Sequence, residues 1–491
     1  MVIEPMKKLN SQVNTITDLI NNYDRTIFKV TFSTSLILYF CYIFCFTQPT
    51  GSFLNHLING ESSENYPNSN SVVATTDLRH IVFGIASSVD SWKNRHPYID
   101  LWWRPNQTRG VLFLDRAPTD NETWPDTSPP FQISGDISKF KDYDHHAMPF
   151  AIRMTRVISE TYNMNFTNVR WFVMADDDTV LFIENLVEVL QRYDHRKYYY
   201  IGGLSECVGQ NWWHSFRMAF GGAGYAMSYP LVRDLSKLLD GCIMRYPYLY
   251  GSDHILQSCI SELGGALTRL PGFHQFDLHG DISGFLSSHP PAPVLSFHHI
   301  DSLDPIFPNK TRDAALRHLM KAEKADHSRI LQQTVCYNHN HNLSFSISWG
   351  YSIHVYERLH APGYLHMPIQ TFQPWNGFGN PPFMFNVRPA SDDPCEAPHV
   401  FYFKNVERTN TSDHITTNYF RNAARELLSC ANNSADSISQ IVVFSPIQPF
   451  KLEEGKRECC TVTEKNSNVT EIEIRSCLDG EASEWSSISS S

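Results

Sequence analysis

The sequence contains no long block of like charge. Its 40 Lys and Arg residues and 51 Asp and Glu residues are interspersed, and the formal net charge is −11. A nucleic-acid groove is normally marked by a dense face of Lys and Arg. We therefore set nucleic acid aside as a partner.

Internal repeats are absent as well, and charged residues make up only 19% of the chain. Against this, 42% of the 491 residues are apolar and 13% are aromatic. A chain of this length and composition can form at least one sizeable hydrophobic core and has enough apolar residues for a second. A chain that is disordered throughout is excluded.

Charge is missing altogether between Val30 and Phe46, and with residues 27–29 the apolar stretch reaches 20 residues. This length crosses a hydrocarbon core of roughly 30 Å. Four basic residues precede its apolar run and the next one is Arg79, so the positive-inside rule places the N-terminus in the cytosol. A cleaved signal peptide is the alternative, but no small-x-small cleavage site follows. We expect a cytosolic tail over 1–26 and a type II signal anchor over 27–46.

Residues 47–77 are rich in Ser, Asn and Glu and poor in large apolar groups, the composition of a stem without a core of its own. Nine of the eleven cysteines and eight Asn-x-Ser/Thr sequons follow the anchor, as suits an oxidising lumen. Nine is odd, so one cysteine stays free, pairs between chains or is buried. We expect a Golgi membrane protein with a luminal catalytic part, and leave a homodimer open.

Beyond the stem, short apolar runs alternate with helical patterns. Ile81–Ala86, Gly110–Asp115 and Arg170–Ala175 are expected to be strands, and Trp92–Trp103 a helix. From Ile183 onward, apolar residues recur at i, i+3, i+4 and i+7, which is typical of a helix packed on a sheet. The alternation indicates an α/β fold.

Past Pro308 the pattern changes. Runs such as Leu343–Tyr356 and His399–Phe403 resemble strands and are separated by clusters of Pro, Gly and Asn. We expect a second, β-rich accessory region over 309–491, to which the sequence assigns no function.

Three consecutive carboxylates, Asp176, Asp177 and Asp178, follow the apolar run that ends at Ala175. Open α/β sheets bind ligands at this end of their strands. Adjacent carboxylates repel one another, and a hard cation such as Mg²⁺ or Mn²⁺ compensates that repulsion while keeping positions for a diphosphate. The alternative is that the three residues cap the next helix and face water.

Three later segments hold further candidates. Gly221, Gly222 and Gly224 form a glycine-rich turn that permits close backbone approach or positive φ. Asp253 stands at the start of an expected helix and is either its N-cap or an active carboxylate. His274 is flanked by aromatic residues and is either structural or a ligand that completes a carboxylate-bound metal.

Taken in order, four segments resemble the fringe-like β1,3-glycosyltransferases, and most closely a plant fringe-related group with a domain of unknown function. The segments are WFVMADDDTV, FGGAGYAMS, GSDHILQSCISELG and LPGFHQFDLHGD. The resemblance covers about Leu78 to Asp304. It implies a GT-A glycosyltransferase domain over 78–308, with a Rossmann-like nucleotide-binding half joined to an acceptor-binding half.

The resemblance also implies roles for individual residues. Asp178 matches the direct metal ligand, and Asp176 and Asp177 would lie against the metal and the donor. His274 matches the second protein ligand to the metal. Asp253 falls at the position of the general base in these inverting enzymes.

Around the base, the pattern implies a sugar pocket and shows one departure. The turn from Gly221 to Gly224 would form a wall of that pocket. Fringe-type enzymes carry an acidic residue just before the base, where this chain has Ser252. Trp212 and Trp213 would either stack on an acceptor ring or pack in the core.

The expected function is therefore inverting transfer of a hexose or N-acetylhexosamine from a UDP-sugar, with Mn²⁺ or Mg²⁺ as cofactor. The acceptor would be a glycan or glycoprotein hydroxyl and the linkage β1,3, the latter from the resemblance alone. An inactive glycan-binding or scaffold protein is the alternative. A metal-dependent hydrolase would need a denser His/Asp ligand set than this sequence shows.

Overall fold

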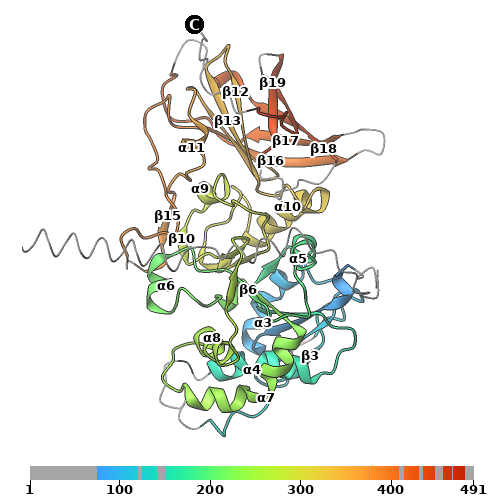
Figure 1. Ribbon diagram of the computed structural model, residues 1–491. Coiled ribbons are helices and arrows are strands. Elements are labelled where there is room, and N and C mark those ends of the chain that lie inside the picture. Colours follow the sequence, from blue (N-terminus) through green and yellow to red (C-terminus); the bar gives the residue numbers. More distant parts are fainter. Residues whose placement is uncertain are drawn as a thin grey trace, which may run out of the picture. The chain divides into compact units, whose positions relative to one another are not determined.

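A computed structural model describes residues 75–481 except 120–123, 141–147, 149, 377–378, 409–413, 431–434, 448–456 and 467 (Figure 1). The expected tail, the anchor and almost all of the stem lie outside these residues. None of the helices in the described part is both long and apolar enough to cross a membrane. Residues from Ala74 onward form one compact unit.

A seven-stranded mixed sheet forms the first half of this unit. Its strand order is β3-β2-β1-β4-β7-β6-β8. β1 pairs in parallel with β2 and β4, whereas β7 is antiparallel to β4. The strands are β1 (Ile81–Ala86), β2 (Gly110–Leu114), β3 (Phe131–Ile133), β4 (Trp171–Asp176), β6 (Tyr200–Gly202), β7 (Tyr225–Ser228) and β8 (Leu267–Arg269). The three strands expected from the sequence are confirmed within one residue at each end.

Helices cover both faces of this sheet, because its central strands are apolar on both sides. Val82 and Phe172 belong to a core shared with α4, α7 and α8, whereas Phe83 and Val173 belong to one shared with α3 and α5. The helices are α3 (Val89–Ile99), α4 (Phe150–Asn163), α5 (Ile183–Leu190), α7 (Tyr229–Arg245) and α8 (Ser252–Glu262). The expected α/β alternation is confirmed.

Two small sheets lie next to the carboxyl end of β4. The first has the order β5-β11-β9, and the second pairs β10 with β15. Within the first, Phe297 of β11 lies opposite His274 of β9. The bounds are β5 (Val180–Leu181), β9 (Phe273–Gln275), β10 (Leu278–Gly280), β11 (Ser296–His298) and β15 (Phe372–Pro374).

The second half of the unit is built on an eight-stranded sheet, so the expected β-rich character past residue 308 is confirmed. The strand order is β12-β13-β14-β16-β17-β18-β20-β19. The strands are β12 (Gln333–Asn338), β13 (Leu343–Ser348), β14 (Ser352–Tyr356), β16 (His399–Arg408), β17 (His414–Arg421), β18 (Gln440–Pro446), β19 (Cys459–Asn466) and β20 (Val469–Arg475). The outermost strands β12 and β19 contact each other and are joined by the Cys336–Cys460 disulfide.

One hydrophobic core connects the two halves. It includes Val180 and Phe297 beside the acidic loop and continues to Ile472 in β20. Helix α10 (Arg312–Ala325) packs on β16, and the short helices α9 (Ser283–Leu286) and α11 (Pro362–Leu365) complete this half. The division expected at 308–309 stays a prediction, although this core runs across it.

All nine cysteines beyond the expected anchor are described. Eight form four disulfides, and Cys207 is free and buried. Burial is one of the outcomes expected for an odd cysteine. The pairs are Cys242–Cys259, Cys336–Cys460, Cys395–Cys430 and Cys459–Cys477.

Candidate active site

A cavity of about 630 Å³ opens at the carboxyl ends of β1 and β4. The loop after β1, the acidic triplet, Asp253 and His298 all line it. Ligand sites of open α/β sheets lie at this edge, and the volume is that of a small-molecule site. The acidic triplet therefore lies in a cavity, at the edge of the sheet that the sequence predicted.

Asp177 is held by the start of α3. Its carboxylate accepts hydrogen bonds from the hydroxyls of Ser87 at 2.7 Å and Ser91 at 2.5 Å. Ser88 is the N-cap of this helix and forms a capping box with Ser91, which fixes Ser91 in the first turn of α3. Asp177 thus connects the triplet to the loop after β1 and to α3. Both of its carboxylate oxygens accept hydrogen bonds from other side chains of the protein.

Asp176 and Asp178 point instead toward His298 at the end of β11. One potential ligand atom from each of the three residues lies within 4.8 Å of the other two. The His298 Nε2 atom is 3.1 Å from Asp178 Oδ1. Neither buried Asp178 oxygen accepts a hydrogen bond of regular geometry from a described residue. Two carboxylates and an imidazole suit Mn²⁺, so these side chains fit a divalent cation.

The pKa directions at this cluster reflect burial and pairing. Burial alone would lower the pKa of His298, but Asp178 beside it raises that pKa to about 9. For Asp178, His298 and Arg95 outweigh burial and hold the pKa well below its usual range. Burial raises the pKa of Asp176 to about 7. Protons and a cation would therefore compete for the same three side chains.

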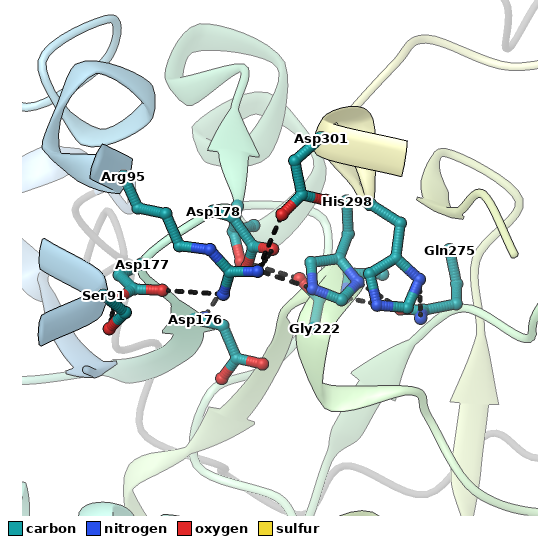
Figure 2. Close-up of polar contacts among 12 residues, drawn as sticks. Ser91, Arg95, Asp176, Asp177, Asp178, Gly222, Gln275, His298 and Asp301 are labelled. Atoms are coloured by element: carbon teal, nitrogen blue, oxygen red, sulfur yellow. Dashed lines mark hydrogen bonds and ion pairs between the residues drawn. The ribbon is translucent and has the colours of Figure 1, made fainter. Parts of the chain in front are cut away.

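Arg95 of α3 supplies a second positive charge to the triplet. Figure 2 shows its guanidinium between three carboxylates, 3.2 Å from Asp177, 3.1 Å from Asp178 and 2.7 Å from Asp301. From the sequence, a bound cation was the expected compensation for the repulsion within the triplet. The structure shows that Arg95 and His298 offset part of it, and neither was assigned from the sequence.

The expectation that His274 joins Asp178 at a metal site is not met by this geometry. His274 is fully buried, and its Nδ1 atom lies 2.6 Å from Glu206. Its ring stacks on Phe276 and does not line the cavity. The structure places His298, on the adjacent strand, where the histidine was expected. The pair His298-His299 after an apolar run was the available sequence signal.

Gln275 sets the tautomer of His298. Its side-chain oxygen accepts a hydrogen bond from the Ala223 amide at 3.0 Å and also lies 3.0 Å from His298 Nδ1. Because that oxygen can only accept, Nδ1 carries the hydrogen and neutral His298 keeps Nε2 as the free acceptor. Such support commonly orients metal-binding histidines.

The three glycines after Phe220 act through close packing. A Cβ on Gly221 would lie 2.3 Å from Asp253 Oδ1, and one on Gly222 would lie 2.0 Å from the His298 ring. Gly224 has φ +81°, a conformation that favours glycine. Gly222 borders the cavity, whereas Gly221 and Gly224 are absent from its lining. Because they lack a Cβ, Gly221 and Gly222 leave room for the side chains of Asp253 and His298. The predicted contact of the glycines with the donor stays a prediction.

Asp253 stands in the first turn of α8 and faces the cavity. The N-cap of that helix is Gly251, so the alternative that Asp253 is the N-cap is wrong. Burial raises the pKa of Asp253, and a hydrogen bond from the Ser252 hydroxyl at 3.2 Å opposes the rise. A partly buried carboxylate with a raised pKa is suited to accept a proton.

Fold and cavity together define an α/β protein with a carboxylate and histidine cluster suited to a cation, and a separate, partly buried carboxylate nearby. Residues 210–461 match the family described as "Protein of unknown function, DUF604". This match spans just over half of the chain, and the protein belongs to that family.

Two curated relatives are β-1,3-glucosyltransferases. The Homo sapiens protein is 26% identical over 234 residues, which are 43% of this chain and 44% of that protein. The Mus musculus protein is 26% identical over 206 residues, 39% of either chain. The chain thus spans less than half the length of these relatives.

Among solved structures, the chain is similar to a galactosyltransferase, LgtC, in complex with donor and acceptor sugar analogs. That likeness has a TM-score of 0.30 and 9% identity, and covers 48% of this chain and 95% of the other. An active-site mutant of LgtC gives a TM-score of 0.29, 11% identity, and coverages of 48% and 94%.

Proposed function

We propose that the protein is a metal-dependent, inverting glycosyltransferase with a nucleotide-sugar donor and a hydroxyl acceptor. The observation that carries this proposal is that one cavity holds both the Asp176, Asp178 and His298 cluster and the partly buried carboxylate of Asp253. The similarity to β-1,3-glucosyltransferases supports transfer of a glucosyl group and a β1,3 linkage. The resemblance of four sequence segments to the fringe-like enzymes implies UDP as the nucleotide of the donor and a GT-A fold for the first half.

The donor diphosphate is assigned to the carboxylate and histidine end of the cavity. Asp178 and His298, with Asp176 beside them, would hold Mn²⁺ or Mg²⁺. The bound ion would supply positive charge where negative charge develops on the leaving diphosphate. Arg95 extends that positive charge along the cavity wall, because its guanidinium faces Asp178 and Asp301.

The acceptor hydroxyl is assigned to the Asp253 end. Its oxygen attacks the anomeric carbon while the bond from that carbon to the diphosphate oxygen breaks on the opposite side. The hydroxyl proton passes to Asp253, and the nucleoside diphosphate leaves. A single displacement of this kind inverts the anomeric centre and needs one base, in line with the leaving group.

The first test is calorimetric titration of UDP into the purified chain with Mn²⁺, then with excess chelator. Binding that requires the metal is expected, and Asp178→Ala and His298→Ala should abolish it. Asp253→Asn should bind UDP nearly as the wild type does and lose sugar transfer. If Asp253→Asn retained full turnover, Asp253 would not be the base.

The pairing of Arg95 with Asp177 and Asp178 favours one alternative, a glycan-binding protein without catalysis. In such a protein the guanidinium would serve as the permanent counterion of the triplet. A folded chain that binds no UDP, with or without Mn²⁺, would support this alternative.

The Golgi location, the type II anchor over 27–46 and the luminal orientation remain part of the proposal. They depend on the charge distribution around the apolar stretch and on the cysteine and sequon content. Protease protection of the chain in sealed microsomes tests them: the part beyond the anchor should be protected and the N-terminal tail cleaved.

A further inference from the structure

Two chain segments at the Asp253 end of the cavity carry five exposed aromatic side chains, here named the aromatic rim. Helix α6 (Val208–Trp213) and the loop after it bear the first group, and the loop before α8 bears the second. Gln210 and His214 on one side, and Tyr250 on the other, line the cavity. The rim consists of Trp212, Trp213, Phe216, Tyr248 and Tyr250.

The rim residues are not part of a core. Trp212 is 78% exposed and Trp213 is 73% exposed, so of the two alternatives left by the sequence, packing in the core is wrong. Isolated exposed aromatics are ordinary, but several on neighbouring segments beside a polar cavity are typical of a ligand-binding surface. The stack of His214 on Tyr250, with ring centroids 5.6 Å apart, connects the two segments.

Helix α6 is fixed by the second half of the protein. The Val208 amide donates a hydrogen bond to Pro382 O, and the Met384 amide donates one to Glu206 O, both at 2.9 Å. The side chain of Asn211 bonds to the Ser205 and Cys207 carbonyls. Figure 1 shows α6 near β15, from which this strip of chain continues. The backbone that carries Trp212 and Trp213 is therefore held in place before binding, which lowers the entropic cost of binding.

The same strip also reaches the cavity. Trp375, directly after β15, lines it together with Asp253. Its indole stacks on His299 and on His279, with centroids 4.6 and 4.5 Å away. Residues outside the fringe-like segment thus contribute both a wall of the cavity and the support of α6.

We propose that the aromatic rim binds an acceptor oligosaccharide of two or more sugar units, an inference that rests on the proposed glycosyltransferase function. The cavity accommodates the ring whose hydroxyl faces Asp253, and the following ring lies on the rim. Flat aromatic faces suit the apolar faces of pyranose rings, and the indole N–H and phenol O–H groups serve the sugar hydroxyls. A monosaccharide acceptor would leave the rim unused.

A lipid surface is the competing occupant. Interfacial segments combine apolar residues with a basic polar face. The two rim segments carry a single Lys or Arg side chain, the exposed Arg217 beside Phe216, and, within the described residues, no aliphatic side chain among the exposed large hydrophobics. Tyr250 of the rim lines the cavity, and this favours the glycan.

The test is binding of the full chain, with UDP and Mn²⁺, to an array of defined mono- to hexasaccharides. The wild type should retain a set of glycans of two or more sugars. The double variant Trp212→Ala/Trp213→Ala should bind that set about ten-fold more weakly or worse, the usual effect of removing an aromatic anchor. Trp212→Tyr/Trp213→Tyr should keep most of the affinity. Phe420→Ala, which alters an exposed aromatic on β17, is the matched control and should bind as the wild type does.

Three outcomes would overturn the proposal: no glycan bound by the wild type, monosaccharides bound as tightly as longer glycans, or equal binding by the double alanine variant. Sedimentation with phosphatidylcholine and phosphatidylserine vesicles tests for a fourth such outcome, binding of the rim to a membrane. Vesicle binding that needs the two tryptophans, without glycan binding that needs them, would make the rim a membrane contact. Metal-dependent UDP titration of the same variants reports on the donor site separately, so failure of the proposed function is distinguishable.

Discussion

The imidazole of His298 lies against the backbone of Gly222 so closely that a Cβ there would stand 2.0 Å from ring atom Cε1. The preceding residue is packed in the same way, since a Cβ on Gly221 would lie 2.3 Å from Asp253 Oδ1. Gly222 therefore makes room for a side chain of the proposed metal site, and Gly221 makes room for the proposed base.

Gly222→Ala should weaken metal-dependent UDP binding, because the methyl group displaces His298 from Asp178. Gly221→Ala should leave UDP binding close to that of the wild type and reduce transfer, because it displaces Asp253. Calorimetry and a transfer assay on both variants check this, with thermal melting to confirm folding. Equal loss of UDP binding in both variants would contradict the assignment.

Transfer should fall as the pH is lowered through the pKa of Asp253, since the base must be unprotonated. Burial raises that pKa, so the loss should begin at a higher pH than for an exposed carboxylate. Ser252→Ala removes a hydroxyl donor to Asp253 and should move the acid limb to still higher pH. The measurement is kcat/KM against pH for both proteins; an unchanged limb would remove Asp253 from the role of the titrating base.

The titration of Glu323 should lower the stability of the protein as the pH rises. Burial and the adjacent Glu184 raise its pKa from 4.5 to about 8, so the folded state binds the proton more tightly than the unfolded state. The free energy of unfolding must then fall between these two pKa values, by at most about 5 kcal/mol.

Glu323→Gln removes this dependence. Its melting temperature should exceed that of the wild type by more at about pH 9 than at about pH 5. Thermal melts at both pH values measure the difference. Parallel shifts at the two values would show that Glu323 does not titrate in this range.

The Cys336–Cys460 disulfide should contribute more to stability than Cys395–Cys430. The first spans 124 residues and joins the outer strands of the eight-stranded sheet, whereas the second spans 35. Loop closure constrains the unfolded chain more for the longer loop, with typical effects of about 2–5 kcal/mol. Urea unfolding of the two double serine variants compares them. A larger loss from the 395–430 pair would contradict this ranking.

The sequence predicted the fold where the signal was local. β1 and β4 are continuous apolar runs, buried on both faces, and such runs identify central strands. Asp176 and Asp178 followed from their place after β4. The closure of the eight-stranded sheet could not be predicted, because contact between β12 and β19 depends on the curvature of the six strands between them.

The choice of His274 rather than His298 has a related reason. His274 and His298 both occur in short strands with aromatic neighbours, and the sequence does not show which of two parallel strands faces the triplet. In the structure β11 pairs with β5 as well as with β9, and this brings His298 to Asp178. Arg95 was missed because an arginine in a helix pattern carries no sign of a partner such as Asp301, 206 residues away.

The backbone contacts between Val208 and Pro382 and between Glu206 and Met384 also bear on how this family can diversify. Substitutions in the strip after β15 can reorient α6 while leaving Asp178 and Asp253 untouched. Relatives with identical chemistry could thus diverge in what they recognise through changes far along the chain. Grafting the second half from one relative onto another would transfer selectivity rather than activity.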